Sequence, residues 1–157
     1  MLLKAIVDED LTNYKHPSML LAFPNCTFKC EKDSGIEMCQ NKSLVLSNNI
    51  EMDIDLIIIR YLNNSLTSTI VCAGLEPFDS FDDLHMFIDH LRKVSNDDVV
   101  IYTGYYKNEI QDQIDVLKLY PNIIVKFGRY IPNQSPHYDK ILGVKLASDN
   151  QYALRIS

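Results

Sequence analysis

Apolar segments of two kinds alternate along this chain, and their order constrains the fold more than any other feature of the sequence. Short apolar runs bounded by turn residues, as buried strands are, cover Met19–Phe23, Ser68–Ala73, Val99–Tyr102 and Ile123–Phe127. The segments between them that are predicted to be helical are Leu56–Leu62, Ser80–Leu91 and Glu109–Tyr120. Strands that alternate with helices form βαβ units, so the sequence predicts an α/β fold with a mostly parallel sheet.

Two helix boundaries are predicted from local motifs. Ser80-Phe81-Asp82-Asp83 has the form of a capping box with Asp in place of Glu, so the Ser80 side chain is expected to cap the helix that follows. Pro121-Asn122 is expected to end the last helix, because Pro cannot continue it.

Residues capable of chemistry follow three of the predicted strands. Cys26 comes after the first strand, Gly74-Leu75-Glu76-Pro77 after the second and Thr103-Gly104-Tyr105 after the third. In open α/β sheets, ligands bind beyond the carboxyl ends of the strands. The sequence therefore predicts one site at this edge of the sheet.

The cysteines are unevenly distributed. Cys26, Cys30 and Cys39 lie within 14 residues, whereas Cys72 stands alone in an apolar run and is expected to be a small buried side chain. The 157 residues have the length of one domain, 1–157. No apolar stretch approaches the ~20 residues that span a bilayer, and the first ten residues show no export signal. We expect a cytoplasmic protein, in which clustered thiols bind metal or do chemistry more often than they form disulfides.

The charge pattern argues against a nucleic-acid partner. Acidic residues outnumber basic ones by 21 to 15, giving a net charge of -6, and the Lys and Arg are scattered along the chain. A duplex-binding surface needs a concentrated basic patch. We therefore expect no direct nucleic-acid partner, and the short apolar stretches lead us to expect no membrane partner.

Three thiolates on one segment can hold either zinc or an iron–sulfur cluster. A structural zinc site needs a fourth ligand, for which His16 and Cys72 are the candidates, and no C-x2-C pair of the ribbon or finger type is present. A four-iron cluster with three protein ligands keeps one iron open. The spacing of the cysteines leaves both possibilities open.

The turn that contains Glu76 favours the cluster. Cys26-x3-Cys30 with a third Cys, followed after the next strand by G-x-E-P, resembles the radical S-adenosylmethionine superfamily. Cys39-Gln40-Asn41, Val100-Ile101-Tyr102-Thr103-Gly104-Tyr105 and Ser148-Asp149-Asn150-Gln151 narrow the resemblance. Together they are similar to motifs of the activating enzymes of anaerobic (class III) ribonucleotide reductases.

The resemblance implies a partial (β/α) barrel and a set of ligands. Cys26, Cys30 and Cys39 would bind a 4Fe-4S cluster. Met38, Gly74, Glu76 and Thr103 would contact S-adenosylmethionine, with Met38 on the adenine and Gly74 and Glu76 at the methionine end. The activity implied is reductive cleavage of S-adenosylmethionine to generate a glycyl radical on the reductase, with electrons from a donor such as a flavodoxin. No residue is assigned as catalytic.

The chain departs from the family pattern in four places, of which the first is Asn13-Tyr14-Lys15-His16-Pro17 in place of a glycine-rich stretch before the first strand. Eight residues, Glu31–Met38, separate the second and third Cys where the superfamily has two, and we expect this insertion to bulge out and return Cys39 to the site. Leu75 replaces the second Gly of G-G-E-P, and Phe127-Gly128 replaces D-G. Two alternatives stay open: a radical enzyme with another glycyl-radical or small-molecule partner, and a zinc-binding αβ adaptor.

Overall fold

The computed structural model describes residues 1–157 and has a six-stranded mixed sheet at its centre. Along the chain the strands are β1 (Leu2–Leu3), β2 (Ala5–Asp10), β3 (Ser18–Phe23), β4 (Ile50–Glu51), β5 (Thr69–Gly74), β6 (Asp98–Tyr102), β7 (Ile123–Phe127), β8 (His137–Asp139), β9 (Val144–Leu146) and β10 (Tyr152–Arg155). The helices are α1 (Lys29–Ser34), α2 (Lys42–Leu46), α3 (Ile54–Leu62), α4 (Phe81–Leu91) and α5 (Gln111–Leu117), with 3-10 turns η1 (Pro77–Ser80) and η2 (Lys107–Glu109).

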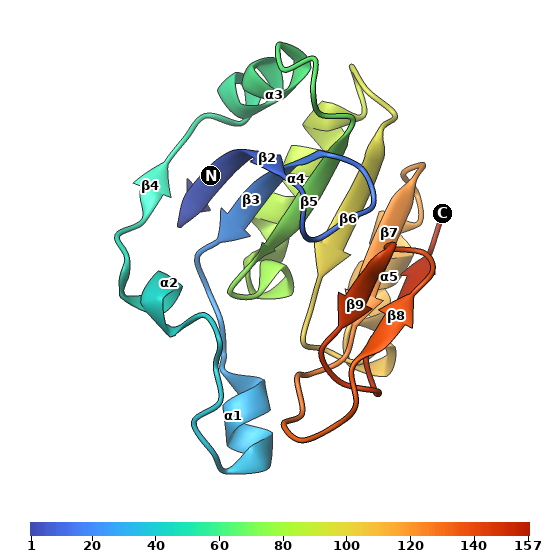
Figure 1. Ribbon diagram of the computed structural model, residues 1–157. Coiled ribbons are helices and arrows are strands. Elements are labelled where there is room, and N and C mark those ends of the chain that lie inside the picture. Colours follow the sequence, from blue (N-terminus) through green and yellow to red (C-terminus); the bar gives the residue numbers. More distant parts are fainter.

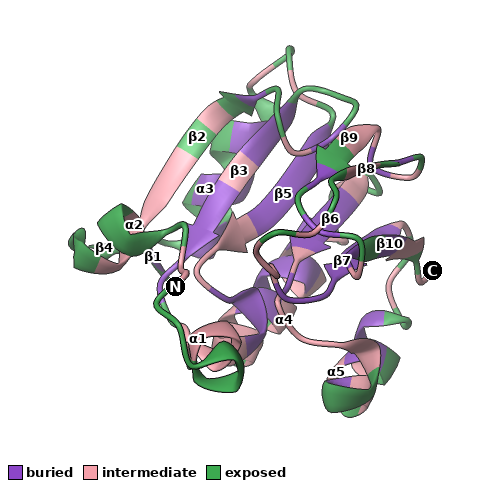
Figure 2. Cartoon of the chain, turned by 60° about the horizontal axis from the view of Figure 1, so that its bottom comes forward, coloured by how far each residue is buried: buried purple, intermediate pink, exposed green.

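The order of strands in the main sheet is β10-β7-β6-β5-β3-β2 (Figures 1 and 2). Strands β3, β5, β6 and β7 pair in parallel, and β2 and β10 are antiparallel edges. The mixed α/β fold with a mostly parallel sheet is therefore confirmed. The sheet does not close into a barrel, because β2 and β10 have one partner each.

The two faces of the sheet are covered differently. On one face α3, α4 and α5 pack against alternate strand residues such as Leu21, Cys72 and Ile101, forming the larger core. On the other face the β8–β9 hairpin and Tyr14 pack against the intervening residues, in a smaller core that includes Val71 and Val100 (Figure 1). Because strands β5 to β7 are buried on both faces, their sequences read as continuous apolar runs (Figure 2).

Most predicted elements are confirmed near their boundaries. The strand Ile123–Phe127 has the bounds expected from the sequence, and Leu56–Leu62 lies in α3, which Asp53 caps by accepting N–H groups from Asp55 and Leu56 at 2.8 and 3.2 Å. None of the helices has the length and apolar content that a membrane crossing requires.

Two helix starts differ from the prediction. Ser80 does not cap α4: its Oγ accepts a hydrogen bond from Asn25 Nδ2 at 3.0 Å, and the turn η1 leads directly into the helix. The helix expected from Glu109 begins at Gln111, because the Glu109 carboxylate accepts from the Tyr106 N–H and closes the separate turn η2.

Candidate metal centre

A cavity of about 600 Å³ opens at the carboxyl ends of the parallel strands. It extends between β9 and the face of the sheet that β9 covers. All seven residues singled out from the sequence line it: Cys26, Cys30, Met38, Cys39, Gly74, Glu76 and Thr103. They come together because β3, β5 and β6 end at the same edge of the sheet. Their individual ligand roles stay a prediction.

The three cysteines differ in their surroundings from Cys72. Cys26, Cys30 and Cys39 are partly exposed free thiols that line the cavity, while Cys72 is fully buried in the helix-side core. Burial raises the pKa of the Cys26 thiol to about 12 and also raises the pKa of the Cys30 thiol. Metal binding at these sulfurs would release their protons.

The donor set contains three thiols, and neither candidate for a fourth zinc ligand lies beside them. No group of three or more His, Cys, Asp or Glu side chains is arranged to hold a single metal ion, and neither His16 nor Cys72 lines the cavity. The thiolates that hold a four-iron cluster bind different irons, so they do not converge on one point as the ligands of a single ion do. Three thiols around one cavity match that requirement.

Glu76 places a buried carboxylate in the same cavity. Its side chain accepts hydrogen bonds from the backbone N–H of Gly104 at 2.9 Å and of Phe78 at 3.2 Å. Its own N–H donates to the Asn25 carbonyl at 2.8 Å, which joins the ends of β3 and β5. Burial raises the pKa of this carboxyl to about 7 despite these hydrogen bonds.

Gly74 is required where β5 ends. Its φ is +95°, and a Cβ there would lie 2.7 Å from Phe23 N and 2.8 Å from Ala22 Cα. Its carbonyl accepts from Asn41 Nδ2 at 2.8 Å, so the segment after Cys39 is attached to the same turn. The glycine lets β3 and β5 approach each other just before Cys26 and Glu76.

We expect Gly74→Ala to lower the free energy of unfolding by about 2 to 6 kcal/mol, the sum of backbone strain and overpacking. Gly35→Ala is the matched control: its φ is +69°, but nothing lies within 4 Å of its Cβ position, so only the left-handed backbone costs energy, about 1 to 2 kcal/mol. Urea unfolding of both variants measures the difference. Equal losses would show that the close approach to β3 contributes nothing.

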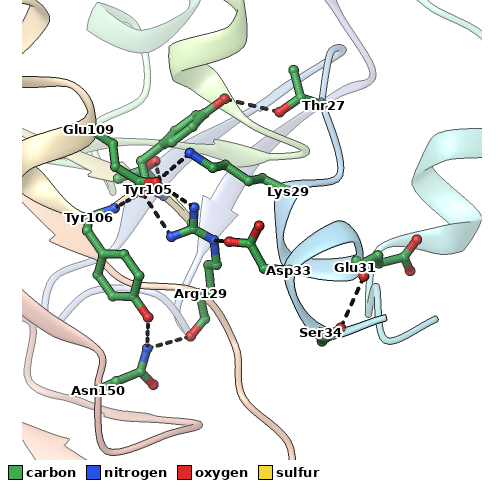
Figure 3. A network of polar contacts seen from close by, with 12 residues as sticks. Thr27, Lys29, Glu31, Asp33, Ser34, Tyr105, Tyr106, Glu109, Arg129 and Asn150 are labelled. Atoms are coloured by element: carbon green, nitrogen blue, oxygen red, sulfur yellow. Dashed lines mark hydrogen bonds and ion pairs between the residues drawn. The ribbon is translucent and has the colours of Figure 1, made fainter. Parts of the chain in front are cut away.

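An ion-pair network not anticipated from the sequence fastens α1 to the sheet (Figure 3). Arg129, which is 6% exposed, donates to both carboxylate oxygens of Glu109 at 2.9 and 2.8 Å. Lys29 pairs with the same carboxylate, and Asp33 Oδ2 lies 2.9 Å from Arg129 Nε. Hydrogen bonds from Arg129 and Lys29 lower the pKa of Glu109 to about 2, so the network is charged at neutral pH. It ties the helix that carries Cys30 to η2 and the end of β7.

Lys126 is a second residue that sequence reasoning missed. Its side chain is buried on β7, lines the cavity and donates to the Gly128 carbonyl at 2.8 Å. Burial lowers the pKa of its ammonium group to about 8. The sequence feature that could have identified Lys126 is its position as a charged residue within an otherwise apolar strand. For Arg129 and Glu109 no such signal existed, since their partners are 20 and 80 residues away along the chain.

Asn150 and Gln151 have structural contacts. The Gln151 side chain accepts from the N–H groups of Ala147 and Ser148 and donates to the Gly128 carbonyl at 3.3 Å. Asn150 Nδ2 donates to the Arg129 carbonyl at 2.9 Å. These side chains fix the turn after β7, and Gln151 also lines the cavity.

Fold and site together define an α/β protein whose parallel strands end at a thiol-lined cavity. The model of a family described as a 4Fe-4S single cluster domain matches residues 18–151, which is most of the chain. The chain belongs to this family. Comparison with curated proteins and with solved structures finds no match. Membership supports the 4Fe-4S cluster expected from the cysteines and is consistent with an iron–sulfur protein of the radical S-adenosylmethionine type.

Proposed function

We propose that this protein is a radical S-adenosylmethionine enzyme that activates a glycyl-radical enzyme of the anaerobic ribonucleotide reductase type. Cys26, Cys30 and Cys39 would hold the 4Fe-4S cluster, consistent with the family and with their common place on one cavity. The observation that carries the proposal is Glu76, a buried carboxylate that lines this same cavity. A ligand that has both a metal-chelating end and an ammonium group would match this cavity, because the cluster would bind the first and the Glu76 carboxylate the second.

The cavity residues would divide the binding of S-adenosylmethionine among them. Glu76 in its ionised form would accept the ammonium group, and the N–H groups of Gly104 and Phe78 keep that carboxylate oriented. Met38 supplies an apolar, polarisable surface for the adenine ring. Gly74, whose missing side chain lets β3 approach, lines the cavity where the methionine end would lie.

When bound, the cluster supplies the electron that cleaves S-adenosylmethionine. The protein's own contribution is to position the ligand and exclude water around it. Helices α3 to α5 cover the other face of the sheet, so the ligand would not reach the cluster from that side. The target would be a glycine in a peptide segment of the partner, and a flavodoxin-type protein would be the electron donor.

Anaerobic reconstitution tests the proposal directly. We expect a brown protein with about four irons and four sulfides per chain that, once reduced, converts S-adenosylmethionine into methionine and 5′-deoxyadenosine. A colourless protein with one zinc per chain, unfolded by a chelator, would support the zinc adaptor and contradict the proposal.

Electron paramagnetic resonance tests the partner. Incubating the reduced protein with S-adenosylmethionine and an anaerobic ribonucleotide reductase should produce a glycyl-radical signal on the reductase. Cleavage of S-adenosylmethionine without such a signal on any reductase would keep the chemistry and replace the partner by another glycyl-radical enzyme or a small molecule.

A further inference from the structure

The segment between Cys30 and Cys39 is folded back on itself by one carboxylate. Glu31 Oε1 accepts hydrogen bonds from the backbone N–H groups of Met38 at 3.0 Å and of Cys39 at 2.8 Å. We call these three residues the Glu31 clamp. The insertion forms a closed turn: helix α1 ends at Ser34, the N–H of its C-cap residue Gly35 donates to the Glu31 carbonyl at 2.9 Å, and the chain then returns to Glu31.

The Glu31 clamp is attached to the rest of the molecule through α1. Asp33, on the same helix, pairs with Arg129, which Glu109 holds in turn (Figure 3). Lys29 adds a second link from α1 to Glu109. The position of Cys39 therefore depends on Glu31, and the position of Glu31 depends on the charged network at the end of β7.

We propose that Glu31 is a positioning residue for the metal centre, which fixes Cys39 in the site and holds the electron affinity of the bound cluster low. The first role follows from its two hydrogen bonds to the chain at Cys39. The second role, on the reduction potential, follows from the acceptor to which those N–H groups donate. Backbone N–H groups donated to cluster sulfurs raise a cluster's reduction potential, and so does a loss of nearby negative charge.

At Cys39 the hydrogen bonding of the backbone and the nearby negative charge both lower the reduction potential of the bound cluster. The N–H groups of Met38 and Cys39 are donated to a carboxylate instead of a sulfur. The Glu31 carboxylate also places a negative charge beside Cys39, because it accepts the hydrogen bond of the Cys39 N–H. A low potential is what reductive cleavage of a sulfonium requires, so this inference rests on the proposed function and deepens it.

Two substitutions separate the roles of Glu31. Glu31→Gln keeps an oxygen that can accept both hydrogen bonds but removes the charge, whereas Glu31→Ala removes both. Glu37→Gln is the matched control, because Glu37 is an exposed carboxylate of the same insertion whose side chain pairs with Lys42.

The first measurement is amide hydrogen exchange of Met38 and Cys39 in the full-length chain, before and after reconstitution. In the iron-free protein we expect exchange to be about tenfold faster in Glu31→Ala than in the wild type, the effect of losing hydrogen bonds to a charged group. Glu31→Gln and Glu37→Gln should stay near the wild-type rate. Equal exchange in Glu31→Ala and the wild type overturns the proposal.

The second measurement is the midpoint potential and iron content of the reconstituted proteins. We expect Glu31→Gln to retain its iron and to show a higher potential, Glu31→Ala to lose most of its iron, and Glu37→Gln to match the wild type in both. An unchanged potential in Glu31→Gln overturns the electrostatic role. If the wild type binds no iron, both the proposed function and this inference are overturned. Protection of the two amides in the iron-free protein would then show that the hydrogen bonds of Glu31 form nonetheless, so that the failure lies in the proposed function.

Discussion

Cys30→Ala is expected to lose at least about nine-tenths of its bound iron after reconstitution, and with it all cleavage of S-adenosylmethionine, since removing a ligand costs at least the 10- to 100-fold in affinity typical of its supporting residues. Cys30 lies in α1 and lines the cavity. Alanine is the best helix former, so the helix and its ion pairs should persist. Iron and sulfide analysis, together with the visible spectrum, measures the loss.

Cys72→Ala makes the same substitution at the fourth cysteine. Cys72 is fully buried in the helix-side core and does not line the cavity. We expect it to keep its iron while losing about 1 kcal/mol of stability to the small void left behind. If the two variants retained equal amounts of iron, Cys30 would not be a ligand.

Glu76→Gln is expected to weaken S-adenosylmethionine binding by about 10- to 150-fold, which is the range for losing a hydrogen bond to a charged group. The substitution leaves all three cysteines in place, so the iron content should stay at the wild-type level. Glu51→Gln is the control, because Glu51 is an exposed carboxylate on β4, away from the cavity. Binding to the reconstituted protein, measured by calorimetry under anaerobic conditions, should separate the two variants. Equal affinities would remove Glu76 from the site.

The same carboxyl gives binding a pH dependence of known sign. Burial raises the pKa of Glu76 to about 7, so without a ligand the group is largely protonated below that pH. An ammonium ligand binds the ionised form, and affinity should therefore increase as the pH rises through about 7. Over the pH range in which the ligand amine stays protonated, this increase should be absent in Glu76→Gln. A similar increase in the variant would assign it to another group.

Stability should change in the opposite direction. A carboxyl whose pKa is higher in the folded state than in the unfolded chain binds more protons when folded between pH 4.5 and about 7. Its contribution to the free energy of unfolding therefore falls as the pH rises through this window. If affinity rises and stability falls over the same pH range in the wild type, burial of ionised Glu76 favours a positively charged ligand and destabilises the fold.

The parallel part of the fold could be predicted from the chain alone. Strands β3, β5, β6 and β7 were found within about a residue or two at each end, because burial on both faces makes each one a continuous apolar run. The edge strands and the β8–β9 hairpin were not found. Strands of three or four residues with one exposed face, such as Val144–Leu146 and Tyr152–Arg155, leave too weak a pattern.

The site could be predicted as a set of residues but not as an arrangement. The carboxyl ends of parallel strands meet at one edge, so the order Cys26, Glu76 and Thr103 along the chain was enough to bring them together. The capping box at Ser80 was wrong for a tertiary reason, because Asn25, 55 residues away along the chain, binds its hydroxyl. Local motifs fail where a distant partner takes the group that the motif needs.

Sequence by itself determined the class of fold, the edge at which the site lies and the residue types that line it, because hydrophobic periodicity and chain order follow from local spacing. Only the tertiary structure decided how the insertion after Cys30 folds, through the Glu31 clamp and the contact of Asp33 with Arg129. It also decided that burial brings the pKa of Glu76 to about 7. The pKa of Glu76 depends on desolvation, and the contact of Asp33 with Arg129 brings together charges from distant parts of the chain, so neither is encoded in a short stretch of residues.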